Sequence, residues 1–180
     1  MQNETEFISE LLQVKTQNEA FKKLMDIFQK RLYAHIRNIV LNHDDADDVL
    51  QNTFVKVFQN LKNFKGECKL YSWMYRIATN EAITFINSKA KRNGNTSADF
   101  QNIQIENLQA DVYFDGSELQ LKLQKAVNVL PKKQQLVFKM KYFQELKYEE
   151  ISEITGTSVG GLKASYFHAV KKIEEFVQKY

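Results

Sequence analysis

The sequence contains few of the residues that disulfide-rich, β-rich or membrane-spanning proteins need. Its 180 residues include one cysteine, so no disulfide can form within the chain. One proline and six glycines supply few of the turns that a many-stranded sheet requires. No apolar run approaches the roughly 18 residues that cross a bilayer, and no signal peptide precedes the first predicted helix. We therefore expect a soluble, cytoplasmic protein without membrane insertion, built mainly from helices.

Charge is distributed unevenly along the chain. Residues 1–92 carry 14 Lys/Arg and 11 Asp/Glu, a net charge of +3, and residues 118–180 carry 11 and 7, a net charge of +4. The connecting residues 93–117 carry four acidic residues and no basic one. Basic segments suit a polyanion such as nucleic acid, although an ordinary solvated surface has a similar composition.

Apolar residues recur at helical spacing through most of the chain, but not between residues 93 and 116. This period predicts helices over about 18–41, 46–61, 70–90, 119–130, 132–144, 147–154 and 159–177. The predicted fold is all-α, with two small helical domains joined by a linker. We place the first domain at residues 1–92, the acidic linker at 93–117 and the second domain, a helix-turn-helix, at 118–180.

Residues 148–163 have the spacing of a helix-turn-helix motif. Gly156 stands where the chain turns sharply and a positive φ is easiest for glycine, and Ser158 can cap the helix that follows. The second helix of such a motif meets base edges in the major groove, with flanking lysines on phosphates. An ordinary pair of antiparallel helices with a glycine turn remains the alternative. The candidate contacts are Lys163, Ser165, Tyr166, His168, Lys171 and Lys172.

Aromatic and cationic residues alternate around the start of the third predicted helix. Rings beside cations suit single-stranded or melted DNA, because unpaired bases stack on the rings while the cations hold the backbone. Core packing is the alternative, and it is favoured for Trp73. The cluster comprises Phe64, Lys65, Lys69, Tyr71, Trp73, Tyr75, Arg76 and Asn80, followed by Lys89, Lys91 and Arg92.

Four aspartates, Asp44, Asp45, Asp47 and Asp48, begin the second predicted helix. They lack the alternating ligands, central glycine and final glutamate of an EF-hand, and the histidines and Cys68 lack zinc-ligand spacing. A helix cap or a surface for a basic partner explains them better. No nucleotide-binding loop or nucleophile–base motif is present. We therefore expect no metal, no cofactor and no enzymatic activity.

Taken together, these segments resemble the extracytoplasmic-function (ECF) sigma factors, the smallest members of the sigma-70 family. Residues 44–58 are similar to the family's polymerase-binding segment, and residues 71–80 resemble its Trp-Leu-Tyr-Arg-Ile-Ala-x-Asn signature. Leu130-Pro131 looks like the opening of the family's second domain. Residues 160–164 stand where the family usually has Gly-Thr-Val-Lys-Ser, with Gly161 in place of the threonine. The resemblance covers about residues 18–177.

The resemblance implies a transcription initiation factor that directs core RNA polymerase to promoters. The polymerase-binding residues would be Asp44, Asp45, Asp47, Asp48, Gln51 and Phe54, on the clamp helices of the largest subunit. The −10 promoter element would meet Phe64, Lys65, Lys69, Tyr71, Trp73, Tyr75, Arg76, Asn80, Lys89 and Arg92. The −35 element would meet Ser158, Gly160, Gly161, Lys163, Ala164, Ser165, Phe167, His168 and Lys171.

The same resemblance implies further partners. The second domain would dock on the flap of the second-largest polymerase subunit, and an anti-sigma factor is a further candidate partner. We hypothesise that the acidic linker crosses a positively charged channel of the polymerase, where a negative strand mimics nucleic acid. Two other hypotheses about the function remain open at this point. One is a stand-alone helix-turn-helix regulator, and the other is an interaction protein that binds no DNA.

Overall fold

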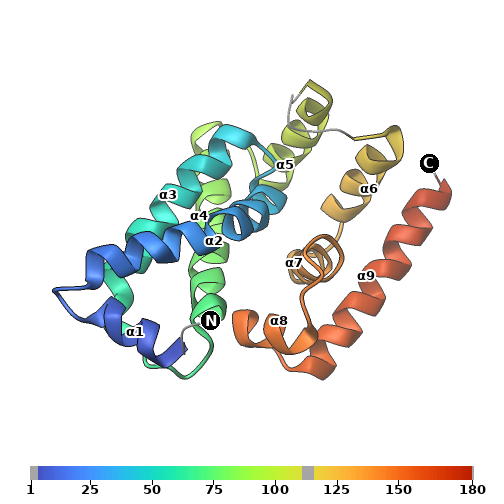
Figure 1. Cartoon of the computed structure of the whole chain (residues 1–180). Helices are drawn as coiled ribbons and strands as arrows, with labels where there is room; N and C mark the ends of the chain where they lie inside the picture. Colours follow the sequence, from blue (N-terminus) through green and yellow to red (C-terminus); the bar gives the residue numbers. More distant parts are fainter. Residues whose placement is uncertain (1–3, 111–115, 180) are drawn as a thin grey trace.

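The computed structural model describes residues 4–110 and 116–179, and every regular element in that part of the chain is a helix. The helices form two groups that lie side by side (Figure 1). The first group comprises α1 (Glu4–Leu12), α2 (Gln17–Val40), α3 (His43–Asn60), the 3₁₀ turn η1 (Leu61–Asn63) and α4 (Leu70–Arg92). The second comprises α6 (Glu118–Asn128), α7 (Lys132–Phe138), the π-helical turn η3 (Lys139–Phe143), α8 (Tyr148–Thr155) and α9 (Val159–Lys179).

Helices α2, α3 and α4 pack against one another and bury their apolar faces between them. Leu24, Leu32, Ile36, Val57 and Met74 are completely or almost completely buried there. Burying each such side chain contributes about 1.5–3 kcal/mol of hydrophobic stabilisation. The three helices therefore form the core of the first domain.

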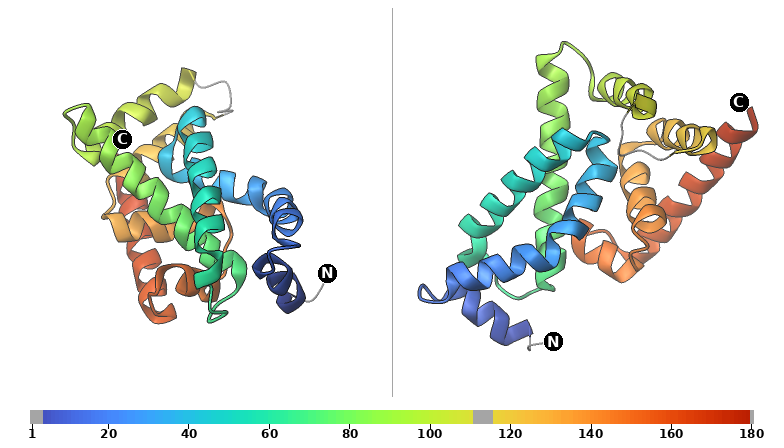
Figure 2. Two further views of the ribbon diagram at one scale, coloured as in Figure 1. Left: turned by 90° about the vertical axis from the view of Figure 1, so that its left-hand side faces the viewer. Right: turned by 45° about the horizontal axis from the view of Figure 1, so that its top comes forward.

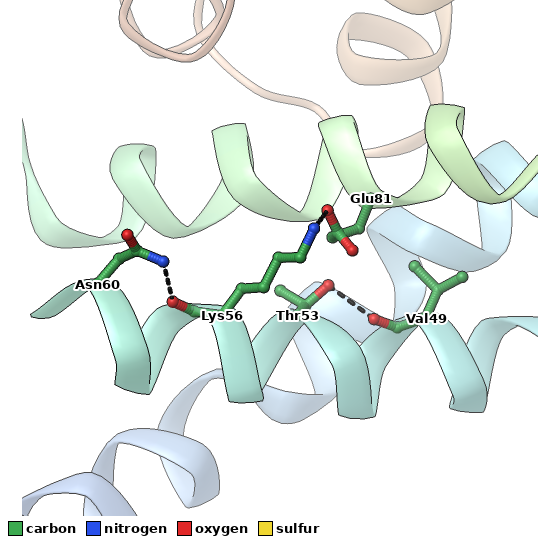
Figure 3. Close-up of polar contacts among 5 residues, drawn as sticks. All are labelled: Val49, Thr53, Lys56, Asn60 and Glu81. Carbon is green, nitrogen blue, oxygen red and sulfur yellow. Dashed lines mark hydrogen bonds and ion pairs between the residues drawn. The ribbon is translucent and has the colours of Figure 1, made fainter.

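Polar contacts fix α3 against α4 at the edge of this core (Figure 3). Lys56 on α3 reaches Glu81 on α4, with its Nζ 2.5 Å from the carboxylate. Within α3, the buried hydroxyl of Thr53 donates to the carbonyl of Val49 at 2.7 Å. The amide of Asn60 donates to the carbonyl of Lys56 at 2.8 Å. The bond of Thr53 satisfies a hydroxyl that is buried away from water, whereas the bonds of Lys56 and Asn60 lie at exposed positions.

The second domain has its own apolar core where α6 and α7 pack on α9. Between α8 and α9 the chain turns at Gly156, whose φ of 71° is the left-handed conformation that glycine adopts without strain. The hydroxyl of Ser158 accepts a hydrogen bond from the backbone N–H of Gly161 at 3.3 Å. The predicted turn glycine and helix cap are therefore confirmed.

The connecting segment contains a helix that the apolar pattern does not predict, α5 (Ser97–Glu106), followed by the 3₁₀ turn η2 (Asn107–Ala110). Thr96 and Asp99 form a reciprocal capping box at the start of α5. Phe100 and Ile105 are its buried residues, and α5 packs on both α4 and α6. Asp111 and Asp115 of the acidic linker lie outside the described residues. Helix α1, which precedes the first predicted helix, is a second element that the sequence pattern missed.

None of the helices in the described residues is both long and apolar enough to cross a membrane.

His35 is completely buried where α2, α4 and the second domain meet. Its Nδ1 lies 2.9 Å from Oε1 of Gln144, and its Nε2 lies 2.8 Å from the hydroxyl of Thr79. Each ring nitrogen of His35 therefore has one hydrogen-bond partner, and the Thr79 hydroxyl itself donates to the carbonyl of Tyr75 at 2.8 Å. Burial lowers the pKa of His35 from 6.5 to about 4, although the bond to Gln144 opposes this shift.

Acid should therefore destabilise the fold through His35. The unfolded chain binds a proton at this histidine below about pH 6.5, whereas the folded chain binds it only near pH 4. The contribution to stability is thus complete above pH 6.5 and is lost as the pH falls toward 4. We expect His35 to lower the free energy of unfolding by up to about 3 kcal/mol over this range.

Urea unfolding at a series of pH values measures this loss. His35→Gln should flatten the acid limb of the profile, whereas His168→Gln, which removes an exposed histidine, serves as the matched control. An acid limb of equal slope in His35→Gln and the unmutated protein would contradict the assignment.

Candidate nucleic-acid interface

Helix α9 presents one continuous exposed stripe along its first half. Its members recur at intervals of three or four residues, which places them on one face of the helix. They are Gly160, Lys163, Ala164, Phe167, His168 and Lys171. Six of the nine residues predicted for the −35 element therefore share this face, and Ser158 is exposed in the turn just before it. Gly161 and Ser165 are only half-exposed.

Two features position the start of α9. The Nζ of Lys163 lies 5.9 Å from the centroid of the Tyr148 ring on α8. The rings of Tyr148 and Tyr166 on α9 pack edge to face. A Cβ at Gly161 would lie 3.3 Å from the capping hydroxyl of Ser158. Glycine therefore leaves room for the cap at the position where the family usually has threonine.

The loop before α4 joins aromatic rings to exposed cations. Phe64 packs on Trp73 with ring centroids 5.2 Å apart, and both rings are partly exposed. Lys65 and Lys69 are exposed beside them. Glu4 on α1 accepts a hydrogen bond from the backbone N–H of Leu70 at 2.9 Å and so caps α4 from outside.

Helix α1 also borders a hollow of about 540 Å³ beside this loop. The hollow is lined in part by Ile8, Phe64, Lys65 and Cys68. Its lining also includes the apolar side chain of Leu12, the cation of Lys69 and the carboxylate of Glu4. No predicted helix covers α1, so the sequence interpretation did not include this hollow.

Some residues predicted to meet the −10 element lie elsewhere. Tyr75 is 3% exposed and lies in the core, where its hydroxyl donates to the carbonyl of Arg31 at 3.3 Å, so it presents no surface to DNA. Lys89 is engaged with the carboxylate of Asp45. Lys89 and Arg92 stand at the far end of α4, about 30 Å from Tyr71 at about 1.5 Å per residue.

Near the start of α4, Tyr71 is partly buried and Arg76 and Asn80 are exposed. Burial raises the pKa of the Tyr71 hydroxyl, and the nearby Glu150 carboxylate raises it further. Apart from the buried Tyr75, the residues predicted for the −10 element therefore form one group between residues 64 and 80. The other two predicted cations, Lys89 and Arg92, lie far from this group.

The exposed face of α3 carries Asp44, Asp48 and Gln51 at helical spacing. Asp45 and Phe54, predicted for the same surface, are buried instead, and Asp47 is half-exposed beside His43 at 3.6 Å. Asn42 caps the helix by accepting from the backbone N–H of Asp45 at 2.9 Å.

The exposed face of α3 continues with two apolar residues, Val55 and Phe58, that the sequence interpretation did not assign to it. They line a mainly apolar hollow between α2 and α3, together with Phe21 and Met25. The side chain of Phe58 is 39% exposed. The face therefore combines acidic residues at one end with apolar residues at the other.

Within residues 4–110 and 116–179 no three His, Cys, Asp or Glu side chains gather closely enough to hold a metal ion. Cys68 is a free cysteine, and burial raises the pKa of its thiol, although Arg76 opposes this shift.

Comparisons with known proteins match two regions of the chain to one family. Residues 24–92 match the family model of sigma-70 region 2, and residues 120–173 match that of sigma-70 region 4. The chain is 27% identical over 168 residues to the ECF RNA polymerase sigma-E factor of Haemophilus influenzae, covering 89% of this chain and 88% of that protein.

Two solved structures have the same fold. One is the structure of CnrH in complex with the cytosolic domain of CnrY, with a TM-score of 0.68, 17% identity and coverage of 98% of this chain and 95% of that one. The other is the sigma factor RpoE in complex with the anti-sigma factor NepR from Bartonella quintana, with a TM-score of 0.63, 19% identity and coverage of 88% and 96%. With both sigma regions present in order and relatives named as ECF sigma factors, this chain belongs to the ECF group of the sigma-70 family.

Proposed function

We propose that this sigma factor binds core RNA polymerase in the cytoplasm through α3 and holds promoter DNA at two separate surfaces. The loop before α4 and the first turns of α4 take the −10 element, and the exposed stripe of α9 takes the −35 element. The observation that carries the proposal is that stripe, because its six exposed residues fit one face of a recognition helix. The protein needs no catalytic group of its own for this role.

At the −10 element we assign the direct contacts to Phe64, Lys65, Lys69, Arg76 and Asn80. A flipped base stacks on an aromatic ring while the lysines hold the backbone of the melted strand. The hollow beside Phe64 provides space for such a base. Tyr75 and the Asp45–Lys89 pair stabilise the fold that presents these groups.

The face of α3 is the proposed polymerase surface. Asp44, Asp48 and Gln51 would meet cations of the clamp helices, and Val55 and Phe58 would meet apolar side chains. Charged and apolar residues that share one face suit a helical partner. The flap of the second-largest polymerase subunit is the proposed partner of the second domain. An anti-sigma factor is a further proposed partner, since the similar RpoE was solved in complex with one.

Lys163 is expected to read a base of the −35 element. Lys163→Ala should weaken binding to a cognate −35 duplex by about 1–3 kcal/mol and should affect a scrambled duplex much less. Fluorescence anisotropy with the two duplexes measures both affinities at one salt concentration. Lys179→Ala, at the opposite end of α9, is the matched control. An equal loss on both duplexes would show that Lys163 contacts phosphate instead.

Polymerase dependence separates this proposal from a stand-alone regulator. A forked promoter fragment with a single-stranded −10 region should be retained at physiological salt when core polymerase and the protein are both present. Neither component alone should retain it with comparable affinity. Tight, sequence-specific binding to duplex DNA without polymerase would favour the stand-alone regulator, and no binding in either case would favour a purely protein-binding role.

A further inference from the structure

A small cavity is bordered by the end of α2, the second half of α4, the start of α5, α7 and η3, whose arrangement can be followed in Figure 2. Its volume is about 70 Å³. That is about five times the space that one buried water needs. A group of four or five heavy atoms therefore fits in the cavity, whereas a nucleotide or a peptide does not.

The lining of this cavity has an apolar part and a polar part. The apolar part consists of Ile39, Ile83, Ile86 and Leu136. The polar part consists of Asn87, Ser97, Gln101, Lys132, Gln135 and Lys139. Two of these side chains are cations, and no aspartate or glutamate belongs to the lining. The cavity is therefore positively charged, and no acid in its lining balances this charge.

Lys139 is the cation that lies inside the protein. Its side chain is 3% exposed, and within residues 4–110 and 116–179 its amine has no hydrogen bond or ion pair. Burial lowers the pKa of Lys139 to about 8, so most of the amine is still protonated at neutral pH. A buried cation without a partner destabilises a fold, and native proteins usually pair such a charge. An anion in the cavity would supply the missing pairing.

Amide groups on the opposite wall can donate to such an anion. The hydroxyl of Ser97 on α5 donates to Oδ1 of Asn87 on α4 at 2.6 Å. This bond engages the oxygen of the Asn87 amide and leaves its N–H groups to donate. Gln101, one turn further along α5, carries a second amide in the lining. Gln135 is not counted, because its N–H groups already donate to two acceptors at the end of α6.

A tetrahedral oxyanion suits this size, charge and set of donors. Its several oxygens can accept from Lys139, from the Asn87 amide and from the exposed Lys132 at the same time. Hydrogen bonds between a cation and an oxyanion are stronger than those between neutral groups. A chloride ion, a single atom, would meet fewer of these donors at once, and a metal cation would be repelled by both lysines.

We propose that this cavity binds inorganic phosphate, or a tetrahedral oxyanion of the same size, through Lys139, Lys132 and Asn87. None of these three residues belongs to the surfaces assigned above to the −10 element, the −35 element or the polymerase clamp. The inference therefore stands or falls independently of the proposed function.

Thermal melting of the free protein near neutral pH tests the proposal. Sodium phosphate is raised from zero to about 20 mM, with sodium chloride keeping the ionic strength constant. For a dissociation constant of about 1 mM, the melting midpoint of the unmutated protein should rise by about 4 °C. Lys139→Met keeps the length of the side chain, removes the charge and should abolish this rise. Lys133→Met, at a neighbouring exposed position outside the lining, is the matched control and should retain it.

The same series distinguishes specific binding from a general salt effect. Phosphate strengthens the burial of apolar groups in any protein. An equal rise in the unmutated protein and in Lys139→Met would therefore overturn the proposal. In chloride alone, Lys139→Met should melt no lower than the unmutated protein, because an apolar side chain is easier to bury than an unpaired cation.

Isothermal titration calorimetry with inorganic phosphate measures the affinity directly. Asn87→Ala should raise the dissociation constant about tenfold, because it removes a donor to a charged ligand. Asn93→Ala, at an exposed position just after α4, should leave the constant unchanged. Adenosine monophosphate should bind more weakly than phosphate, because its nucleoside exceeds the cavity. Absence of binding to the unmutated protein, equal constants for the two asparagine variants or tighter binding of the nucleotide would each overturn the inference.

Discussion

Reversing the charge of Asp44 and Asp48 should weaken binding to core RNA polymerase by about 100-fold. Both side chains are exposed on one face of α3, and neither contributes to the buried core. If that face meets cations of the polymerase clamp, Asp44→Lys with Asp48→Lys replaces two attractive contacts by like-charge contacts. The loss should shrink as salt is raised, because salt screens exposed charges.

Fluorescence titration of labelled protein with core polymerase measures this affinity at two salt concentrations. Glu174→Lys with Glu175→Lys is the matched control, since it makes the same change in net charge at exposed positions near the end of α9. Thermal melting checks that both double variants are folded. Equal polymerase affinities for the two double variants would exclude the acidic face of α3 as the docking surface.

Lys89→Ala should lower the free energy of unfolding by about 2–3 kcal/mol. This is the largest loss of stability that we expect from substituting a partly exposed side chain. Nζ of Lys89 lies 2.5 Å from Oδ1 of Asp45, whose side chain is only 7% exposed. The other oxygen, Oδ2, is buried without a hydrogen-bond partner. Removing the lysine leaves a buried carboxylate uncompensated, which costs more than the pair itself contributes.

Urea unfolding measures the loss, with the exposed Lys91→Ala as the control that should change stability by less than about 0.5 kcal/mol. Adding Asp45→Asn to Lys89→Ala should recover part of the stability, because the neutral amide is easier to bury than the carboxylate. No recovery in the double variant would show that the lysine acts through packing of its aliphatic chain.

The sequence interpretation missed two short helices, α1 and α5, although α1 carries Phe7, Ile8 and Leu11 at helical spacing. Helix α1 buries only Leu11, and α5 buries only Phe100 and Ile105. Both are short and depend on contacts with other elements, in α5 reinforced by the capping box at Thr96. Apolar period alone detects a helix only when one face is covered along its length.

Sequence reasoning placed functional side chains less well than it placed helices. It grouped Asp45 with three other aspartates, but the structure turns this one inward toward Lys89, 44 residues away in the chain. It assigned Tyr75 to DNA because of its neighbours, although its place on α4 faces the core. Which face of a helix is buried depends on elements that are distant in sequence. The spacing of apolar residues does not identify those elements.

More of the residues predicted for α9 are exposed, because the first half of this helix has one face that no other described element covers. Helix α8 also packs on α4, a contact that the sequence interpretation did not predict. Ser72, Arg76 and Glu153, which form hydrogen bonds there, are polar residues on two helices, and their meeting depends on how the two domains pack.

Run-off transcription measures whether this protein directs core RNA polymerase to promoters. Core RNA polymerase is incubated with promoter-bearing genomic fragments, with and without this protein. We expect discrete transcripts that appear only when the protein is present and that disappear with Asp44→Lys combined with Asp48→Lys. An identical set of transcripts with and without the protein, at low salt and with excess protein, would contradict it.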